Sequence, residues 1–125
     1  MTISYRPAED LKVLVEEIVC RAGLDYIDTS RVLCFRSRGS KSKRIVARCY
    51  SLPKIWQIGL GTDAHYIIEV ISERFDKMSE EERVKVIIHE LLHIPRTFGG
   101  GLRPHRGYVT NRAINEIYSR LRARR

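Results

Sequence analysis

The segment from Ser79 to Pro95 constrains the fold of this chain more strongly than any other, because its start, its buried side and its end can all be recognised. Ser79-Glu-Glu-Glu82 has the spacing of a capping box, in which a serine and a glutamate satisfy the first free N–H groups of a helix. Apolar residues then recur at helical spacing and predict one buried stripe: Val84, Ile87, Ile88 and Leu91. Pro95 disfavours helical backbone at the residue before it, so the helix is predicted to end at about Ile94.

Two histidines lie on the side of this predicted helix opposite the stripe, in His89-Glu-Leu-Leu-His93. They are one turn apart and within about 40° of each other around the axis, so both imidazoles can reach one zinc ion at roughly 2.0–2.1 Å. Glu90 is offset by about 100°, which places its carboxylate beside the metal as a base rather than as a ligand. The alternative is two hydrogen-bonded histidines on a buried helix. Because the apolar stripe already supplies a buried face, we favour the metal site.

A zinc site that activates water needs a third protein ligand, and the sequence offers two candidates. His105 follows a glycine run, Gly99 to Gly101, which can turn the chain back over the end of the helix. Glu116 lies on a predicted last helix, in a stretch that resembles the glutamate ligand motif of thermolysin-like zinc peptidases. The residues alone leave both open. His65 precedes a predicted strand and is expected at the surface or at the strand end.

The remaining segments predict a small α+β domain. We expect these elements in chain order: a helix from Pro7 to Gly23, a hairpin of strands 31–36 and 45–50, a short helix 52–58, a strand 65–71 and, after the motif helix, a last helix 110–121 capped by Thr110. No repeat or linker divides the chain, so residues 1–125 are predicted to form a single domain with a short, mostly antiparallel sheet. Cys34 and Cys49 would face each other across the hairpin, as reduced buried thiols or, alternatively, as a disulfide.

The chain has a net charge of +8, and its basic residues are clustered. One cluster lies at the loop between the two hairpin strands: Arg36, Arg38, Lys41, Lys43 and Arg44. Five arginines in the segment 112–125 form another. Such clusters suit contact with nucleic acid, and the alternative is a solvated loop and a basic helix end. No apolar segment is long enough for a bilayer and no signal peptide is recognised, so we expect a soluble, cytoplasmic protein without membrane contact.

The run HELLHIP followed by GGLRPH, together with ARCYSLPKIWQ and YIIEVISERFD upstream, resembles the phage and archaeal metallopeptidase family, a group of small zincins. More distantly, these segments resemble Spartan-like proteases. The resemblance implies a zincin fold with zinc on His89, His93 and His105 and with Glu90 as the base. It also favours His105 over Glu116 as the third ligand. The eleven residues between His93 and His105 are a wider spacing than Spartan-like proteases have.

The predicted function is therefore that of a zinc-dependent peptidase acting on a protein or peptide substrate. Tyr108 or Arg103, both close to His105, is the expected donor to the oxyanion, and Tyr108 is the candidate for a second catalytic residue. A substrate strand is expected to add to the sheet edge along residues 65–71. Two alternatives stay open: a zinc-dependent endoribonuclease of the YbeY-like type, which lacks the glutamate of this motif, and a nucleic-acid-binding module with a structural zinc.

Overall fold

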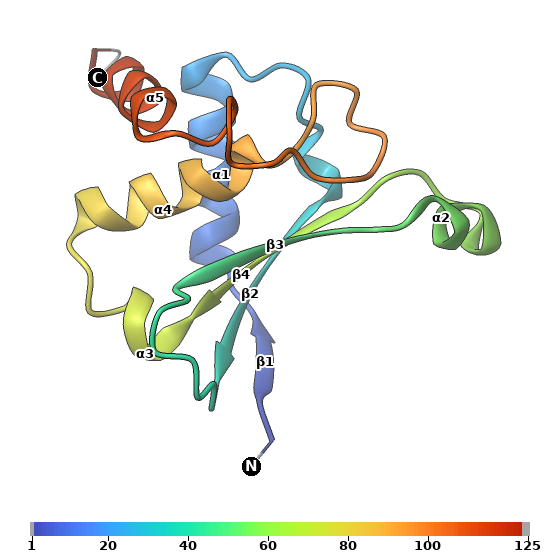
Figure 1. The fold of residues 1–125 in the computed structure, drawn as a ribbon, viewed down its shortest axis with the longest axis horizontal. Helices are drawn as coiled ribbons and strands as arrows, with labels where there is room; N and C mark the ends of the chain where they lie inside the picture. The colour runs from blue at the N-terminus through green and yellow to red at the C-terminus, as the bar shows by residue number, and fades with distance from the viewer. Residues whose placement is uncertain (1, 124–125) are drawn as a thin grey trace.

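Four strands form a mixed sheet in the computed structural model, which describes residues 2–123 (Figure 1). Their spatial order is β1 (Ser4–Pro7), β2 (Val32–Arg38), β4 (Tyr66–Ile71) and β3 (Ala47–Ser51). Strand β1 is antiparallel to β2, β2 is parallel to β4, and β4 is antiparallel to β3. Two of the three pairings are antiparallel, so the predicted α+β domain with a short, mostly antiparallel sheet is confirmed.

The predicted hairpin of residues 31–36 and 45–50 is wrong, because β4 is inserted between β2 and β3. Five of the six residues of β4 are buried, and a strand that is buried along both faces belongs in the middle of a sheet. The loop from Gly39 to Val46 is also long enough to cross the width of one strand. Burial of β4 therefore overrides the local pairing that the sequence order suggests.

The same insertion separates the two strand cysteines. Cys34 and Cys49 are both register partners of Ile68, one on each side of β4. Two strand spacings amount to about 9–10 Å, whereas the Cα atoms of a disulfide lie within about 7 Å. The three cysteines of the chain are free thiols, and the interpretation of Cys34 and Cys49 as reduced residues holds.

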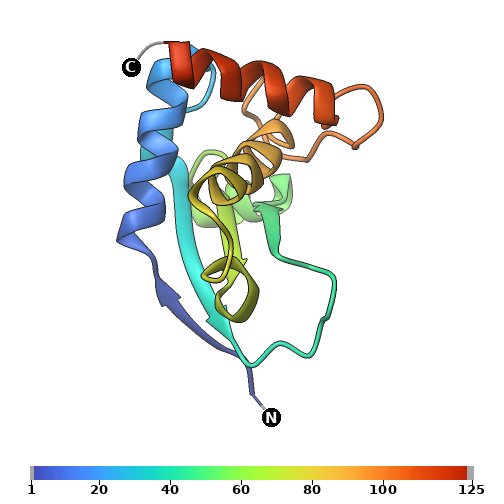
Figure 2. The same ribbon diagram turned by 90° about the vertical axis from the view of Figure 1, so that its left-hand side faces the viewer.

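Helices α1 (Glu9–Ala22), α4 (Glu80–Leu92) and α5 (Asn111–Ala123) gather over one face of the sheet (Figures 1 and 2). Helix α1 ends at Gly23, whose φ of 70° is left-handed, as predicted. Its predicted start at Pro7 is wrong, because residues Ser4–Pro7 pair with β2 as an edge strand. Proline has no N–H to donate to a sheet, and an edge strand tolerates this because only one of its sides is paired.

Shorter elements connect these layers. They are the 3-10 helix η1 (Thr29–Arg31), helix α2 (Lys54–Leu60) and helix α3 (Ser72–Phe75). Helix α2 begins and ends two residues later than predicted, and Gly61 terminates it with a φ of 65°. It projects from one end of the sheet (Figure 1). No helix among residues 2–123 is long and apolar enough to cross a membrane.

The core lies between the sheet and the three long helices, and it fixes the rotation of α4. Ile87, Ile88 and Leu91 have no exposed surface and pack against the same core as the inward residues of β2 and β4. Both hydrogen bonds of the capping box between Ser79 and Glu82 are present. Helix α4 ends at Leu92, two residues before the predicted end. Its apolar stripe therefore turns the histidine side away from the core, as predicted.

Candidate metal centre

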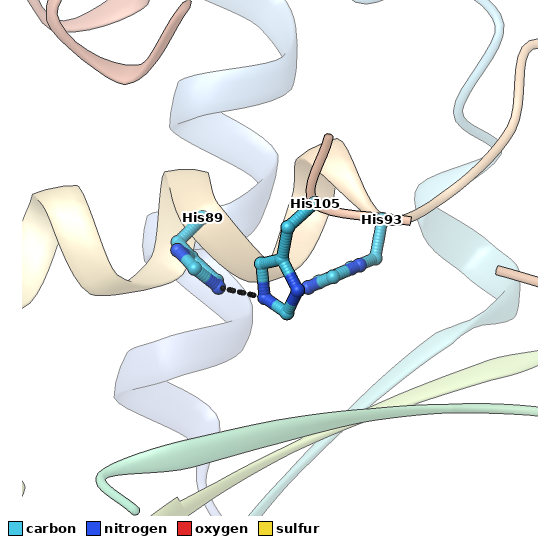
Figure 3. A group of neighbouring side chains, drawn as sticks. All are labelled: His89, His93 and His105. Atoms are coloured by element: carbon cyan, nitrogen blue, oxygen red, sulfur yellow. Dashed lines mark hydrogen bonds between the residues drawn. The ribbon is translucent and has the colours of Figure 1, made fainter. Parts of the chain in front are cut away.

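Three histidines converge beside the end of α4 (Figure 3). His89 lies in the last turn of α4, His93 caps that helix, and His105 comes from the loop before α5. One nitrogen from each ring lies within 4.8 Å of the others. The Nε2 atoms of His89 and His105 are 3.3 Å apart, and the centroids of the His93 and His105 rings are 4.7 Å apart. The structure thus brings together the three residues that were predicted as metal ligands.

Backbone atoms of Arg103 hold His93 in its orientation. The Arg103 N–H donates to the His93 carbonyl at 2.7 Å, and the Arg103 carbonyl lies 2.7 Å from Nδ1 of His93. A carbonyl can only accept, so Nδ1 carries the proton and Nε2 keeps its lone pair for a metal ion. Metal-binding histidines commonly have such a partner behind the ring. The sequence did not predict this contact, because every residue has a backbone carbonyl and the residue type does not show which carbonyl will face His93.

His105 is held by the turn that follows it. The N–H groups of Tyr108 and Val109 both donate to the His105 carbonyl, at 3.2 and 2.8 Å. Val109 is buried in the core, so this turn is anchored to the body of the protein. The His105 ring itself is exposed and reaches over α4 toward His89 and His93 (Figure 3).

The Glu90 carboxylate lies next to this group and is almost fully buried, with 6% of the residue exposed. Its Oε2 is 3.9 Å from Nε2 of His89. Burial raises the pKa of Glu90 from 4.5 to about 7, because the charged form loses its hydration. A carboxylate with a pKa near neutrality is suited to accept and return a proton.

The pKa of His89 is shifted in the opposite direction. Burial lowers it, and the positive charges that His93 and His105 would carry lower it further. At neutral pH the His89 imidazole is therefore neutral, which is the form that binds a metal ion.

The burial of Glu90 makes the stability of the metal-free protein depend on pH. Above pH 7 the folded protein must hold a buried carboxylate, whereas the unfolded chain ionises Glu90 freely from about pH 4.5. Wild-type protein in chelator should therefore lose stability relative to Glu90→Gln as the pH rises from 4.5 to 7.5, by up to about 3 kcal/mol. Denaturant unfolding of both proteins in chelator across this range measures the difference in the free energy of unfolding. If the difference in unfolding free energy between the two proteins stayed constant from pH 4.5 to 7.5, burial would not raise the pKa of Glu90.

The donor set fits zinc. Three imidazole nitrogens are donors that zinc accepts, and a set of three protein ligands, which leaves one position for water, is typical of a catalytic rather than a structural zinc site. Glu116 is elsewhere, on α5, where it accepts a hydrogen bond from Arg120 at 2.7 Å. His65 contacts the Asp63 carbonyl just ahead of β4, which agrees with its predicted place at a strand end.

Tyr108 and Arg103 lie against each other near His105. The Arg103 guanidinium is 5.1 Å from the centre of the Tyr108 ring and 5.7 Å from that of Tyr26, so its charge stacks on aromatic faces. Tyr108 is half exposed. Its role as a donor to the oxyanion stays a prediction.

One member of the predicted basic cluster has a structural role. Arg36 lies on the inner face of β2 and forms ion pairs with Asp10 at 2.5 Å and Asp76 at 3.0 Å, with 15% of its side chain exposed. Its charge is already balanced inside the fold, so Arg36 has less free charge to offer to nucleic acid than the exposed members of the cluster have. The cluster residues that are exposed are Arg38, Lys41, Lys43 and Arg44.

The second basic segment is only partly available. Arg120 binds both Glu116 and the Ala22 carbonyl, and Arg122 lies over the ring of Tyr118. Arg112 is exposed at the start of α5, whereas Arg124 and Arg125 lie outside the residues that the structure describes. Contact with nucleic acid stays a prediction.

Fold and site together define a small α+β protein with a three-histidine group suited to a metal ion and a buried glutamate beside it. The chain belongs to the family described as "Putative phage metallopeptidase", whose model matches residues 3–118. This match confirms the resemblance seen in HELLHIP and GGLRPH, and it indicates a metallopeptidase that uses a metal ion. A search of curated proteins and a search of solved structures each found no match.

Proposed function

We propose that this protein is a zinc-dependent peptidase. The observation that carries the proposal is the convergence of His89, His93 and His105 at one point, with the buried carboxylate of Glu90 beside them. These histidines would hold the zinc, which when bound polarises a scissile carbonyl and makes a water more acidic. Glu90 accepts the proton of the attacking water and delivers it to the leaving amine. Tyr108 is the proposed donor to the developing oxyanion.

The substrate strand needs a different sheet edge from the one predicted. Residues 65–71 form the central part of the sheet, because β4 is paired on both sides, so an added strand there is excluded. Strand β3 is the edge next to α4, and its outer side pairs with no strand among residues 2–123. An extended peptide can add to such an edge through backbone hydrogen bonds, which would bring its scissile bond beneath the histidine group.

The test of the proposed function is zinc-dependent cleavage of protein. Purified wild-type protein is expected to contain about one zinc per chain and to cleave casein or a peptide library. A chelator should remove this activity, and added zinc should restore it. RNA is the control substrate, because the endoribonuclease alternative requires its cleavage. Zinc without cleavage of any peptide would leave the structural-zinc alternative.

The identity of the third ligand can be tested by comparing His105→Ala with Glu116→Ala. Zinc affinity should collapse for His105→Ala, because two remaining ligands hold the ion far more weakly. Glu116→Ala should bind zinc as the wild type does, since this side chain pairs with Arg120 at the surface. Competition with chelators of graded affinity measures both. The opposite result would establish a thermolysin-like ligand set.

Nucleic-acid contact through the exposed basic loop is a separate expectation. Binding of duplex or single-stranded nucleic acid at about 50 mM salt should weaken steeply by about 200 mM, because it depends on the release of counterions. Replacing Lys41, Lys43 and Arg44 by glutamine should make the salt dependence shallower by roughly one unit of slope per lost phosphate contact. The absence of any mobility shift at low salt would show that these charges only support solubility.

A further inference from the structure

The loop that connects His93 to His105 has a conformation that the chain does not favour by itself. Gly99 to Gly101 provide little local preference, and Gly100 and Gly101 have left-handed φ values of 109° and 78°. Phe98 also has a positive φ, of 47°, which is disfavoured for a residue with a large side chain. Such a loop keeps one shape only if contacts from the surrounding structure hold it.

Tyr66 on β4 supplies the first of these contacts. Its residue is fully buried, and its hydroxyl accepts a hydrogen bond from the Gly100 N–H at 2.9 Å. Its ring packs against the ring of Phe98, with 5.0 Å between the centroids. One side chain therefore holds the loop at both the strained residue and the glycine run.

Gln57 on α2 supplies the second. Its Nε2 donates to the Gly99 carbonyl at 3.3 Å and to the Leu52 carbonyl at 2.9 Å. The fit is close, because a Cβ added at Gly100 would lie 2.8 Å from this nitrogen. Gln57 is the buried residue of α2, whereas the apolar side chains of that helix are exposed: Ile55, Trp56, Ile58 and Leu60.

The burial of a polar residue in place of four apolar ones indicates that α2 is oriented by this contact and not by core packing. Downstream of Gly100 the chain reaches Arg103, whose backbone is bonded to His93, and then His105. The contacts of Tyr66 and Gln57 thus bear on the path of the chain into the third ligand.

We propose that Gln57 and Tyr66 are positioning residues for the metal centre, which hold the loop in advance so that His105 meets His89 and His93. This inference rests on the proposed zinc site. If the loop is already ordered in the metal-free protein, metal binding does not have to restrict it further. The entropic cost of binding is then smaller, and His105 contributes more to zinc affinity than it would from a mobile loop. The hydrogen bonds of both residues go to the backbone of this loop and of Leu52, and none goes to a histidine of the cluster.

The experiment is a double-mutant cycle on zinc affinity. Tyr66→Phe removes only the hydroxyl, and Gln57→Met keeps the shape of the side chain without its donor. Each should weaken zinc binding by about tenfold in the wild-type background, the low end of the effect of residues behind the ligands. In a His105→Ala background the loss should be much smaller for each, because the main group they position is gone and only the orientation of His93 by Arg103 still depends on the loop. Chelator competition gives the affinities, and circular dichroism of each metal-free protein verifies the fold.

Tyr50→Phe is the matched control. This tyrosine lies on β3, and its hydroxyl bonds to Glu69 on the neighbouring strand instead of to the loop. Its removal should leave zinc affinity unchanged. Because Gln57 is at the periphery of the core, Gln57→Met keeps the test valid if Tyr66→Phe does not fold.

Three results would overturn the inference, and they differ from one another. Unchanged affinity in both variants would show that the loop needs neither contact. Equal losses with and without His105 would show a general structural effect. A wild-type protein that binds no zinc would overturn the metal site itself, together with this inference.

Discussion

Glu90→Gln is expected to bind zinc with wild-type stoichiometry and to lose peptide hydrolysis by roughly 10²–10⁴-fold, the usual contribution of a general base. The amide is nearly isosteric with the carboxylate and fits the same buried place, but it cannot accept a proton from water. His89 and His93 depend on α4 and on the Arg103 backbone for their positions, so the ligands should stay in place. The variant therefore separates the chemical step from metal binding.

The measurement is kcat/KM on one peptide for wild type and variant at equal zinc content. Glu116→Gln is the matched control, because it makes the same change at an exposed glutamate whose surface ion pair contributes little to stability. It should keep wild-type activity. If Glu90→Gln cleaved the peptide within a few-fold of the wild type, Glu90 would have no part in the proton transfer.

The His89→Ala, His93→Ala double variant is expected to lose its zinc completely after dialysis against a chelator. It retains one of the three clustered imidazoles, and a single imidazole does not hold zinc against a chelator. Metal analysis after dialysis gives the stoichiometry, and thermal unfolding with and without zinc shows whether the ion still stabilises the fold. Wild-type protein should gain stability from zinc, and the double variant should not.

His65→Ala is the control for this experiment, since it removes the histidine that lies outside the cluster, next to Asp63. It should bind one zinc and be stabilised by it. Stoichiometric zinc in the double variant would falsify the metal site, and with it the proposed peptidase.

Much of the motif helix and its chemistry was determined by local sequence. The capping box from Ser79, the apolar stripe and Pro95 define where α4 begins, which side it buries and roughly where it ends. Each of these three features depends on interactions between residues that are close in sequence, so a short segment is enough to predict its effect. The placement of His89 and His93 on one side, with Glu90 next to them, follows from helix geometry alone.

The sequence reduced the candidates for the proposed third ligand to two residues but did not choose between them. His105 and Glu116 were both open to reasoning from the residues, and the resemblance to a family favoured His105. The structure places His105 in the cluster and Glu116 in a surface ion pair. The turn that follows His105 holds this histidine in place, and buried Val109 anchors the turn to the core. This contact cannot be predicted from the number of residues between His93 and His105.

Only the tertiary structure decided how the strands pair. Sequence order suggested a hairpin of residues 31–36 and 45–50, yet β4 lies between them, and the four residues of β1 complete the sheet. Strand order depends on which strand gains the most free energy from burial on both faces. That free energy depends on all the elements that cover the sheet, most of which are distant in sequence. The sheet edge that we propose for a substrate strand changed accordingly, from β4 to β3.

Several residues likewise took roles that their own surroundings in the sequence do not reveal. Arg36 is balanced by two carboxylates from distant helices and turns, and Gln57 and Tyr66 reach the loop from segments that precede the motif. Local sequence determined the helix that carries two of the proposed ligands and the proposed base, because helical hydrogen bonds and periodicity span only a few residues. The sheet order, the position of His105 in the histidine cluster and the contacts around it required the folded chain, because they join groups separated by tens of residues.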